Sequence, residues 1–400
     1  MNRYCITRMK GKILSFLLDE NGHALEIHGD TEQGSVLGNI CIGKVQRVAK
    51  NIRAAFVEIA PGQPCYLPLD DLKNPVYTRK GPSPAIQQGD ELVVQVSRDA
   101  IKTKAPALTT RISLSGVYTA VDFGHPGAGV SRKLPDKERE RLKALGEGML
   151  LKVRDELGEF GCPGIVLRTN SGSVPEAAVE EELFSLTAKL KTLLTGAVHR
   201  TCFSCLYRTP PGWLNRLLSL HASETERIVV EDAGLYQQAL DFLGEYSESL
   251  KGRLVHYQDD LLPMHKLYSL ERELEDALAE RVWMKSGAYL VVQPTEALTV
   301  IDVNTGKYEK GKEKEEAILK INLEAARETA RQMRLRNLSG IVIVDFINMG
   351  QESSRRKVLE ELRECLAMDP LQAHVVDMTK LELVELTRKK TEPSLAQQLL

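Results

Sequence analysis

Two short β-branched segments, each carrying an aspartate near its end, most constrain how this chain can fold. The first is Leu298–Asn304, with the sequence LTVIDVN, and the second is residues 341–348, with the sequence IVIVDFIN. A buried apolar strand has no packing reason to end in a carboxylate. One long helical pattern joins the two segments, so they can lie side by side. Asp302 and Asp345 would then meet at the same edge of a sheet.

Two carboxylates at one sheet edge favour a bound cation. At a separation of about 4 Å and an effective dielectric constant of about 20, two negative charges repel by roughly 4 kcal/mol. A hard divalent cation removes this repulsion, and Mg²⁺ typically binds one or two carboxylates together with waters and substrate phosphate oxygens. The pattern therefore predicts a Mg²⁺ site for phosphodiester chemistry.

The composition is that of an ordinary globular protein. The 400 residues predict two to three domains at about 150 residues each. The net charge of −2 argues against a histone-like protein and leaves any nucleic-acid contact to local patches. No stretch reaches the roughly 18 apolar residues of a membrane span, and residues 13–18 lack the flanks of a signal peptide. Seven scattered cysteines, an odd number, favour the reducing cytoplasm.

Residues 38–113 contain five short apolar segments separated by Gly and Pro, which predict a small OB-type barrel. Within residues 54–59, alternation places Phe56 on the polar face together with Glu58. An outward aromatic side chain is where an OB fold stacks bases, and Tyr66 on the next strand is a second candidate. The alternative is that Phe56 belongs to the core.

A candidate phosphate contact follows the apolar residues 164–167. Arg168 can bind a phosphate through its guanidinium and Thr169 through its hydroxyl. The alternative is an ordinary solvated arginine at the end of a strand. Cys202 and Cys205 form an isolated CxxC motif. Zinc needs four ligands and no second pair lies near, so these cysteines are predicted to be structural.

The remaining patterns alternate strands and helices. They predict two strands in residues 1–34, a strand, helix and strand in 224–258, a helix at 269–280, a long helix at 313–336, a strand at 373–378 and a helix at 381–390.

A further helix is predicted to begin near Ser353 with Arg355, Arg356 and Lys357 in its first turns. Cations at this end oppose the helix dipole. A phosphate partner therefore explains them better than helix stability does.

Taken together, these segments resemble the ribonuclease E/G family of bacterial endoribonucleases over nearly the whole chain. The tandem strands carrying Asp302 and Asp345 are the most specific match. The other matching segments are 38–45 (GNICIGKV), 54–57 (AAFV), 107–110 (ALTT), 168–169, 295–304 (TEALTVIDVN), 322–326 (NLEAA), 334–336 and 340–346 (GIVIVDF).

The resemblance implies an α+β multidomain fold. An RNase H-like subdomain would be assembled from residues 1–35 and 214–278, without catalytic acids of its own. An OB-fold RNA-binding domain would occupy 36–117, a 5′-sensor domain 118–213, and a DNase I-like catalytic subdomain 279–400.

The resemblance also implies roles for single residues. Asp302 and Asp345 would bind Mg²⁺, with Mn²⁺ as a substitute, and Asn304 would orient the site by hydrogen bonding. The positions that would contact RNA are Phe56, Tyr66 and Lys104, and those that would receive a 5′-monophosphate are Arg168, Thr169 and Lys380.

The activity implied is metal-assisted hydrolysis of single-stranded, A/U-rich RNA in rRNA maturation and mRNA decay. The products would carry 5′-phosphate and 3′-hydroxyl ends, and a 5′-monophosphate would stimulate cleavage. The partners expected are therefore rRNA precursors and mRNA, with no membrane.

This chain departs from the family pattern at three points. Asn348 stands where an Asp is common, and Glu382 stands where a Gly is common, near the expected 5′-phosphate pocket. The family's CPxCxG motif does not occur before Leu400. A dimer built on a shared Zn²⁺ is therefore not expected, although another homo-oligomer remains open, and the short ribonuclease G type is the closer match.

Two alternatives to an active nuclease follow. Asn348 and Glu382 favour a catalytically weak or inactive RNA-binding protein that keeps the fold. A metabolic α/β enzyme with an accessory barrel is the other alternative. The presence of Asp302, Asn304 and Asp345 together favours the nuclease, because a protein that only binds RNA gains nothing from two repelling acids.

Overall fold

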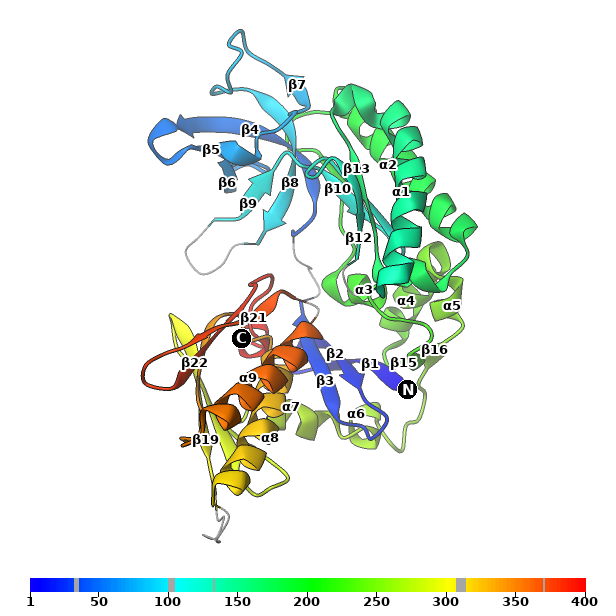
Figure 1. Cartoon of the computed structure of the whole chain (residues 1–400). Coiled ribbons are helices and arrows are strands. Elements are labelled where there is room, and N and C mark those ends of the chain that lie inside the picture. The colour runs from blue at the N-terminus through cyan, green and yellow to red at the C-terminus, as the bar shows by residue number, and fades with distance from the viewer. Residues whose placement is uncertain (32–35, 100–104, 132–133, 307–313, 370) are drawn as a thin grey trace. The chain divides into compact units, whose positions relative to one another are not determined.

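The computed structural model describes residues 1–31, 36–99, 105–131, 134–306, 314–369 and 371–400. The fold is mixed α+β, with four sheets, one of which closes into a small barrel (Figure 1). The chain forms two compact units. Unit 1 comprises residues 1–32, 222–241 and 249–400, and unit 2 comprises 33–221 and 242–248. No helix among the described residues is long and apolar enough to cross a membrane.

A six-stranded sheet dominates unit 1. Its strand order is β17-β18-β19-β20-β22-β21, and only the central pair β19–β20 is parallel. One face packs on the helices α8 and α9, which lie side by side in Figure 1. The bounds are β17 (Arg281–Trp283), β18 (Tyr289–Pro294), β19 (Leu298–Asn304), β20 (Gly340–Asp345), β21 (Ala373–Met378), β22 (Leu383–Arg388), α8 (Lys314–Leu335), α9 (Glu352–Ala367) and α10 (Leu395–Gln398).

Strict alternation gives this sheet one buried and one open face. Ile301 and Val303 on β19 are buried against the helices, whereas Asp302 between them is exposed. The same alternation continues on β20, where Val344 is buried and Asp345 is exposed. The two aspartates therefore lie on the face that the helices leave uncovered.

The helix predicted at residues 381–390 is wrong. Leu383–Arg388 forms β22, a central strand between β20 and β21. Val384, Leu386 and Arg388 point to the core. Arg388 interrupts the alternation of apolar residues that would indicate a strand, because a charged residue stands at a position that faces the core. Its guanidinium binds the buried Asp369 at 2.9 Å.

The second sheet of unit 1 combines the N-terminus with residues more than two hundred positions later. Its order is β16-β15-β1-β2-β3, and β1 pairs with β15 in parallel. Residues 1–34 contain three strands instead of the two predicted, because a turn at Lys10-Gly11 separates β1 from β2. The bounds are β1 (Asn2–Met9), β2 (Lys12–Leu18), β3 (Ala24–Asp30), β15 (Thr225–Val230), β16 (Leu254–His256), α4 (Ala233–Tyr246), α5 (Glu248–Lys251), α6 (Met264–Leu267) and α7 (Leu270–Leu278).

Unit 2 contains the predicted small barrel. Strands β4, β5, β6, β9 and β8 are paired in that order, and the pairing of β8 with β4 closes the ring. The bounds are β4 (Ile40–Ala49), η1 (Lys50–Ile52), β5 (Ala54–Glu58), β6 (Pro64–Pro68), η2 (Leu69–Asp71), β7 (Tyr77–Arg79), β8 (Glu91–Arg98), β9 (Ala107–Thr109) and β14 (Cys205–Tyr207).

The rest of unit 2 is a four-stranded sheet of order β10-β11-β13-β12 that packs on α1 and α2. The bounds are β10 (Ser113–Ser115), β11 (Thr119–Asp122), β12 (Gly127–Val130), β13 (Gly164–Leu167), α1 (Asp136–Leu157), η3 (Gly158–Phe160), η4 (Thr169–Ser173), α2 (Glu176–Ala197) and α3 (Gly212–Leu217).

Candidate active site

The two aspartates face one another across the only parallel strand pair of the six-stranded sheet. Asp302 on β19 is in register with Asp345 on β20. Neighbouring strands lie about 4.8 Å apart, and residues in register point to the same face. The structure therefore brings together the two carboxylates that the sequence pattern placed at one sheet edge.

The electrostatics of this pair are those of two like charges. Burial, and in addition the negative charge of Asp302, raise the pKa of the Asp345 carboxyl. The amide of Asn304 donates a hydrogen bond of 2.7 Å to Oδ2 of Asp302. Asn304 thus holds one carboxylate in a fixed orientation while leaving the other oxygen of Asp302 for a ligand.

The donor atoms suit a hard cation. Both candidate ligands are carboxylate oxygens, and the described residues contain no group of three or more His, Cys, Asp or Glu arranged to hold a metal ion. A cation at Asp302 and Asp345 would complete its coordination with water and substrate oxygens, which is how Mg²⁺ is usually bound. The residues present therefore fit Mg²⁺.

A buried asparagine positions the loop that follows Asp345. The Asn322 side chain on α8 donates to the carbonyl of Ile347 at 2.7 Å and accepts from its N–H at 3.1 Å. This two-bond clamp anchors the backbone two residues after Asp345. Asn322 lies in the matched segment 322–326, although its role was not apparent from the sequence.

A pocket of about 510 Å³ lies at the same end of the sheet as the aspartates. Its lining consists of Asn348, Met349, Gly350, Arg355, Lys380, Leu381 and Glu382. The pocket is next to Asp345 in the sheet, because Leu383, the residue after Glu382, pairs with Asp345. Asn348 and Glu382, the two substituted positions among the three departures from the family pattern, therefore line one pocket.

The protein's own acids pair with two of the three cations at the start of α9, Arg355 and Arg356. Arg355 donates to the carboxylate of Glu382 at 2.6 Å and to the carbonyl of Met349 at 2.9 Å. Arg356 pairs with Glu352 at 2.6 Å. Arg355 and Arg356 are therefore compensated within the protein, and Glu382 holds the arginine that lines the pocket. A phosphate partner for these cations stays a prediction.

On the barrel, Phe56 and Tyr66 form a cross-strand pair on the outer face. They are in register on β5 and β6, their ring centroids lie 6.3 Å apart, and both are half-buried. Their neighbours Ala55 and Val57 are fully buried. The predicted facing of Phe56 is thus confirmed. The third predicted RNA contact, Lys104, lies outside the described residues.

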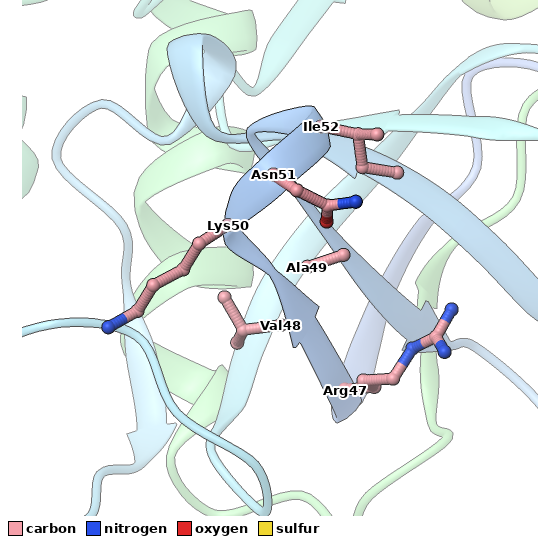
Figure 2. Close-up of a pocket in the computed structure, with 6 residues that line it drawn as sticks. All are labelled: Arg47, Val48, Ala49, Lys50, Asn51 and Ile52. Carbon is pink, nitrogen blue, oxygen red and sulfur yellow. The ribbon is translucent and has the colours of Figure 1, made fainter.

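Arg47 extends this aromatic pair and was not singled out from the sequence. It is in register with Phe56, and its guanidinium carbon lies 4.8 Å from the ring centroid. A pocket of about 530 Å³ is lined by residues 47–52 (Figure 2). Figure 2 shows the side chains of Arg47 and Lys50 extending away from one another, so these cations do not converge on one ligand. Arg47 belongs instead with Phe56.

Arg168 and Thr169 lie at the end of β13 in unit 2. Arg168 is half-buried, and its Nη1 donates to the carbonyl of Gly116. Burial lowers the pKa of its guanidinium, an effect that the nearby Glu182 opposes. The hydroxyls of Thr169 and Ser131 lie 2.8 Å apart. The Arg168 side chain is therefore fixed by a hydrogen bond and partly shielded from solvent, unlike an ordinary solvated arginine.

Lys380, which the resemblance assigned to the 5′-phosphate, is exposed and lies in unit 1. Cys202 and Cys205 are both free thiols, and Cys205 begins β14, which pairs with β4.

Comparisons with known proteins place the chain in a family. The sequence model of the Ribonuclease E/G family matches residues 113–391. The chain is similar to Ribonuclease G of Escherichia coli K12, with 35% identity over 393 residues that cover 94% of this chain and 77% of that protein. It is also similar to Ribonuclease G of Haemophilus influenzae, with 33% identity over the same shares. Ribonuclease E of a Nostoc species is 32% identical over 88% of this chain and 51% of its own length. This chain belongs to the ribonuclease E/G family.

Proposed function

We propose that this chain is a Mg²⁺-dependent endoribonuclease whose active site is formed by Asp302, Asn304 and Asp345. The observation that carries the proposal is the in-register placement of the two carboxylates on the open face of the sheet, with Asn304 bonded to one of them. The relatives that match 94% of this chain are named ribonucleases, which supports an RNA substrate.

Each residue has a distinct part in the chemistry. A bound Mg²⁺ or Mn²⁺ ion would supply polarisation of the scissile phosphate and an activated water. Asp302 and Asp345 would hold the ion at the sheet edge, and Asn304 keeps the Asp302 carboxylate oriented. Hydrolysis that breaks the bond between phosphorus and the 3′-oxygen leaves a 5′-phosphate and a 3′-hydroxyl.

The barrel supports a single-stranded substrate, because half-buried aromatics on its outer face can hold unstacked bases. The preference for A/U-rich RNA rests on the family resemblance. We assign the barrel to an OB-fold RNA-binding domain (36–117) and residues 279–400 to a DNase I-like catalytic subdomain. Residues 118–213 form a 5′-sensor domain, and 1–35 with 214–278 an RNase H-like subdomain. The cellular role is rRNA maturation and mRNA decay in the cytoplasm.

The deciding experiment is cleavage of a 5′-monophosphorylated single-stranded RNA in the presence of Mg²⁺. We expect Asp302→Asn and Asp345→Asn each to reduce the cleavage rate at least 100-fold, as the loss of a principal charge-stabilising group does. RNA binding by either variant should be kept, and a chelator should abolish cleavage by the parent. Cleavage that survives both substitutions would exclude this site.

A second function is favoured by one observation, the ion pair between Glu382 and Arg355 in the pocket beside the aspartates. An acid in that position opposes an RNA phosphate. If the parent protein binds single-stranded RNA but does not cleave it with Mg²⁺ or Mn²⁺, the chain is an RNA-binding protein that retains the fold.

The 5′-end preference has its own test. We propose that Arg168 and Thr169 receive the 5′-monophosphate, while the assignment of Lys380 rests on the resemblance alone. Arg168→Ala should erase the preference for 5′-monophosphorylated over 5′-hydroxyl RNA. Arg168→Lys, which keeps the charge but loses the planar fork, should retain part of it. An unchanged ratio in Arg168→Ala would remove this role.

A further inference from the structure

A cluster of two aromatic rings and a guanidinium lies on the open face of the six-stranded sheet. Trp283 and Tyr289 have ring centroids 5.0 Å apart. The guanidinium carbon of Arg281 lies 4.5 Å from the centroid of Tyr289 and 5.8 Å from that of Trp283. The three residues come from the hairpin β17–β18, and no role was predicted for them from the sequence.

The strand register connects this cluster to the catalytic residues. Trp283 pairs with Tyr289, which pairs in turn with Asn304. One row further along the strands, Arg281 pairs with Val291, Val291 with Asp302, and Asp302 with Asp345. Residues in one row share a face of the sheet. Tyr289 is therefore the direct cross-strand neighbour of Asn304, the amide that orients Asp302, and Trp283 lies one strand beyond it.

The core of the protein does not account for these rings. Val282 and Leu290, the residues that alternate with them, supply the apolar contacts to the core, whereas the Trp283 side chain is 62% exposed. Within the described part of the chain, no acidic side chain forms an ion pair with Arg281. An exposed large aromatic surface beside a cation indicates a contact with a partner.

We infer that Arg281, Trp283 and Tyr289 form a base-stacking platform for the unpaired nucleotide next to the scissile phosphate. This inference rests on the proposed function. Every base has a π-face that stacks on an aromatic ring, and Arg281 adds stacking together with a positive charge for the RNA backbone. Asp302 and Asp345 lie on the same face and repel RNA. The positive charge of Arg281 in their row offsets this repulsion, which favours an anionic partner over an apolar one.

The two tryptophans of the chain make the platform directly observable. Trp213 is 1% exposed, and Trp283 is the exposed one. In a full-length Asp302→Asn protein, which holds RNA without cutting it, fluorescence of Trp283 should be quenched by a single-stranded oligonucleotide. An oligonucleotide of the same length with abasic sites should quench it far less. Trp213→Phe isolates the signal.

Binding measurements provide the second readout. Trp283→Ala in the Asp302→Asn background should weaken binding of the single-stranded RNA by roughly 5- to 100-fold, the usual effect of removing one stacked ring. Trp283→Phe should recover much of that loss. Ile341→Ala is the matched control, because Ile341 is an exposed apolar residue on the same face in a row away from the aspartates, and it should bind RNA as the parent does.

Three results would overturn the inference. They are an unchanged emission of Trp283 on adding RNA, an unchanged affinity in Trp283→Ala, and a loss of self-association in Trp283→Ala, seen by sedimentation, without loss of RNA binding. The last result would assign the cluster to contact with a second copy of this chain. Because these readouts measure binding, they are independent of whether Asp302 and Asp345 catalyse cleavage.

Discussion

At the scale of single residues, the site depends on the repulsion between two aspartates and on one amide that restrains the first of them. Burial first, and the negative charge of Asp302 in addition, raise the pKa of Asp345, so part of the shift reflects repulsion between the two carboxylates. Asn304 cannot relieve this repulsion, because its hydrogen bond orients Asp302 without neutralising it. A bound cation would remove this repulsion.

Replacing one acid should therefore stabilise the protein when no divalent cation is present. We expect Asp302→Asn to raise the melting temperature by about 1–4 °C at neutral pH, the range for relief of one exposed charge pair. The folded-state pKa of Asp345 is raised, so the folded protein loses stability as the pH rises from the ordinary aspartate pKa of about 3.9 through the raised value. The gain should thus disappear well below pH 3.9.

Calorimetry with and without Mg²⁺ checks this. Mg²⁺ should raise the melting temperature of the parent, since a ligand that binds only the folded state stabilises it, and should have little effect on Asp302→Asn. A variant that is less stable than the parent without Mg²⁺ would contradict the repulsion.

Asn304 should affect catalysis more than substrate binding. Removing its hydrogen bond in Asn304→Ala lets the Asp302 carboxylate rotate. We expect a 10- to 100-fold loss in kcat or in apparent Mg²⁺ affinity, the usual effect of losing a group that orients a metal ligand. A titration of cleavage rate against Mg²⁺ separates the two, and RNA binding measured by anisotropy should not change. A change confined to KM for RNA would mean that Asn304 contacts the substrate instead.

At the scale of elements, two features of β22 were not predictable from local sequence. Leu and Glu within Leu383–Arg388 are good helix formers, and the inward Arg388 interrupts the apolar alternation. Its partner Asp369 follows α9, and Asn337, which accepts a second bond at 2.7 Å, follows α8. Only the folded chain brings these three together, so no local pattern could indicate that a charge belongs in this core.

Breaking this buried pair should be strongly destabilising. Arg388→Ala removes the cation from the Asp369 carboxylate, whose side chain is only 3% exposed in the intact pair. We expect the free energy of unfolding to fall by about 3–5 kcal/mol, as measured by urea denaturation. The control Arg363→Ala on the exposed side of α9 should change it by less than about 0.5 kcal/mol. Equal effects of the two substitutions would show that the pair is solvated.

Glu382, which stands where the family commonly has Gly, lies in the turn between β21 and β22. This residue has a φ of +65°, a left-handed conformation that favours glycine, and its carboxylate pairs with Arg355. Glu382→Gln should release Arg355 for an RNA phosphate. We expect affinity for single-stranded RNA to rise about two- to fivefold at low salt, with a slope of log affinity against log salt steeper by roughly 0.7.

A matched control is available at the first residue of α9. Glu352 forms an ion pair of the same length, 2.6 Å, with Arg356, and Glu352→Gln should leave RNA affinity unchanged. If both substitutions raise affinity equally, the effect is one of net charge and not of the pocket.

At the scale of the whole molecule, prediction succeeded where the signal was local or motif-based. Paired aspartates on adjacent strands, an outward Phe56 and a small barrel are confirmed, because alternation and strand endings are read within a few residues. Strand pairing between distant segments was not available from periodicity. The cluster of Arg281, Trp283 and Tyr289 was missed because β17, a strand of three residues, is too short to show alternation.

The position of β1 offers a test at this scale. It is the central strand of its sheet, and Ile6 is fully buried and in register with both Val230 and Ser15. Ile6→Pro removes a backbone donor from the middle of the sheet and should destabilise the protein by about 3 kcal/mol or more. The control Ile6→Val keeps the N–H and should cost about 0.5–1.5 kcal/mol. Soluble yield and urea midpoints measure both.

Because β1 pairs with β15, the N-terminal strand can complete its sheet only late in synthesis on the ribosome. Arg3 and Glu226, which bond across this pair, are 223 positions apart. At a translation rate of about 5–20 residues per second, the first strand waits roughly 10–45 s for its parallel neighbour. During that interval one edge of β1 stays open while all of residues 33–221 emerge and can fold. The nascent N-terminus is therefore the segment of this protein for which a chaperone has the longest opportunity, and slowing of translation between these strands should lower soluble yield more than slowing after β16.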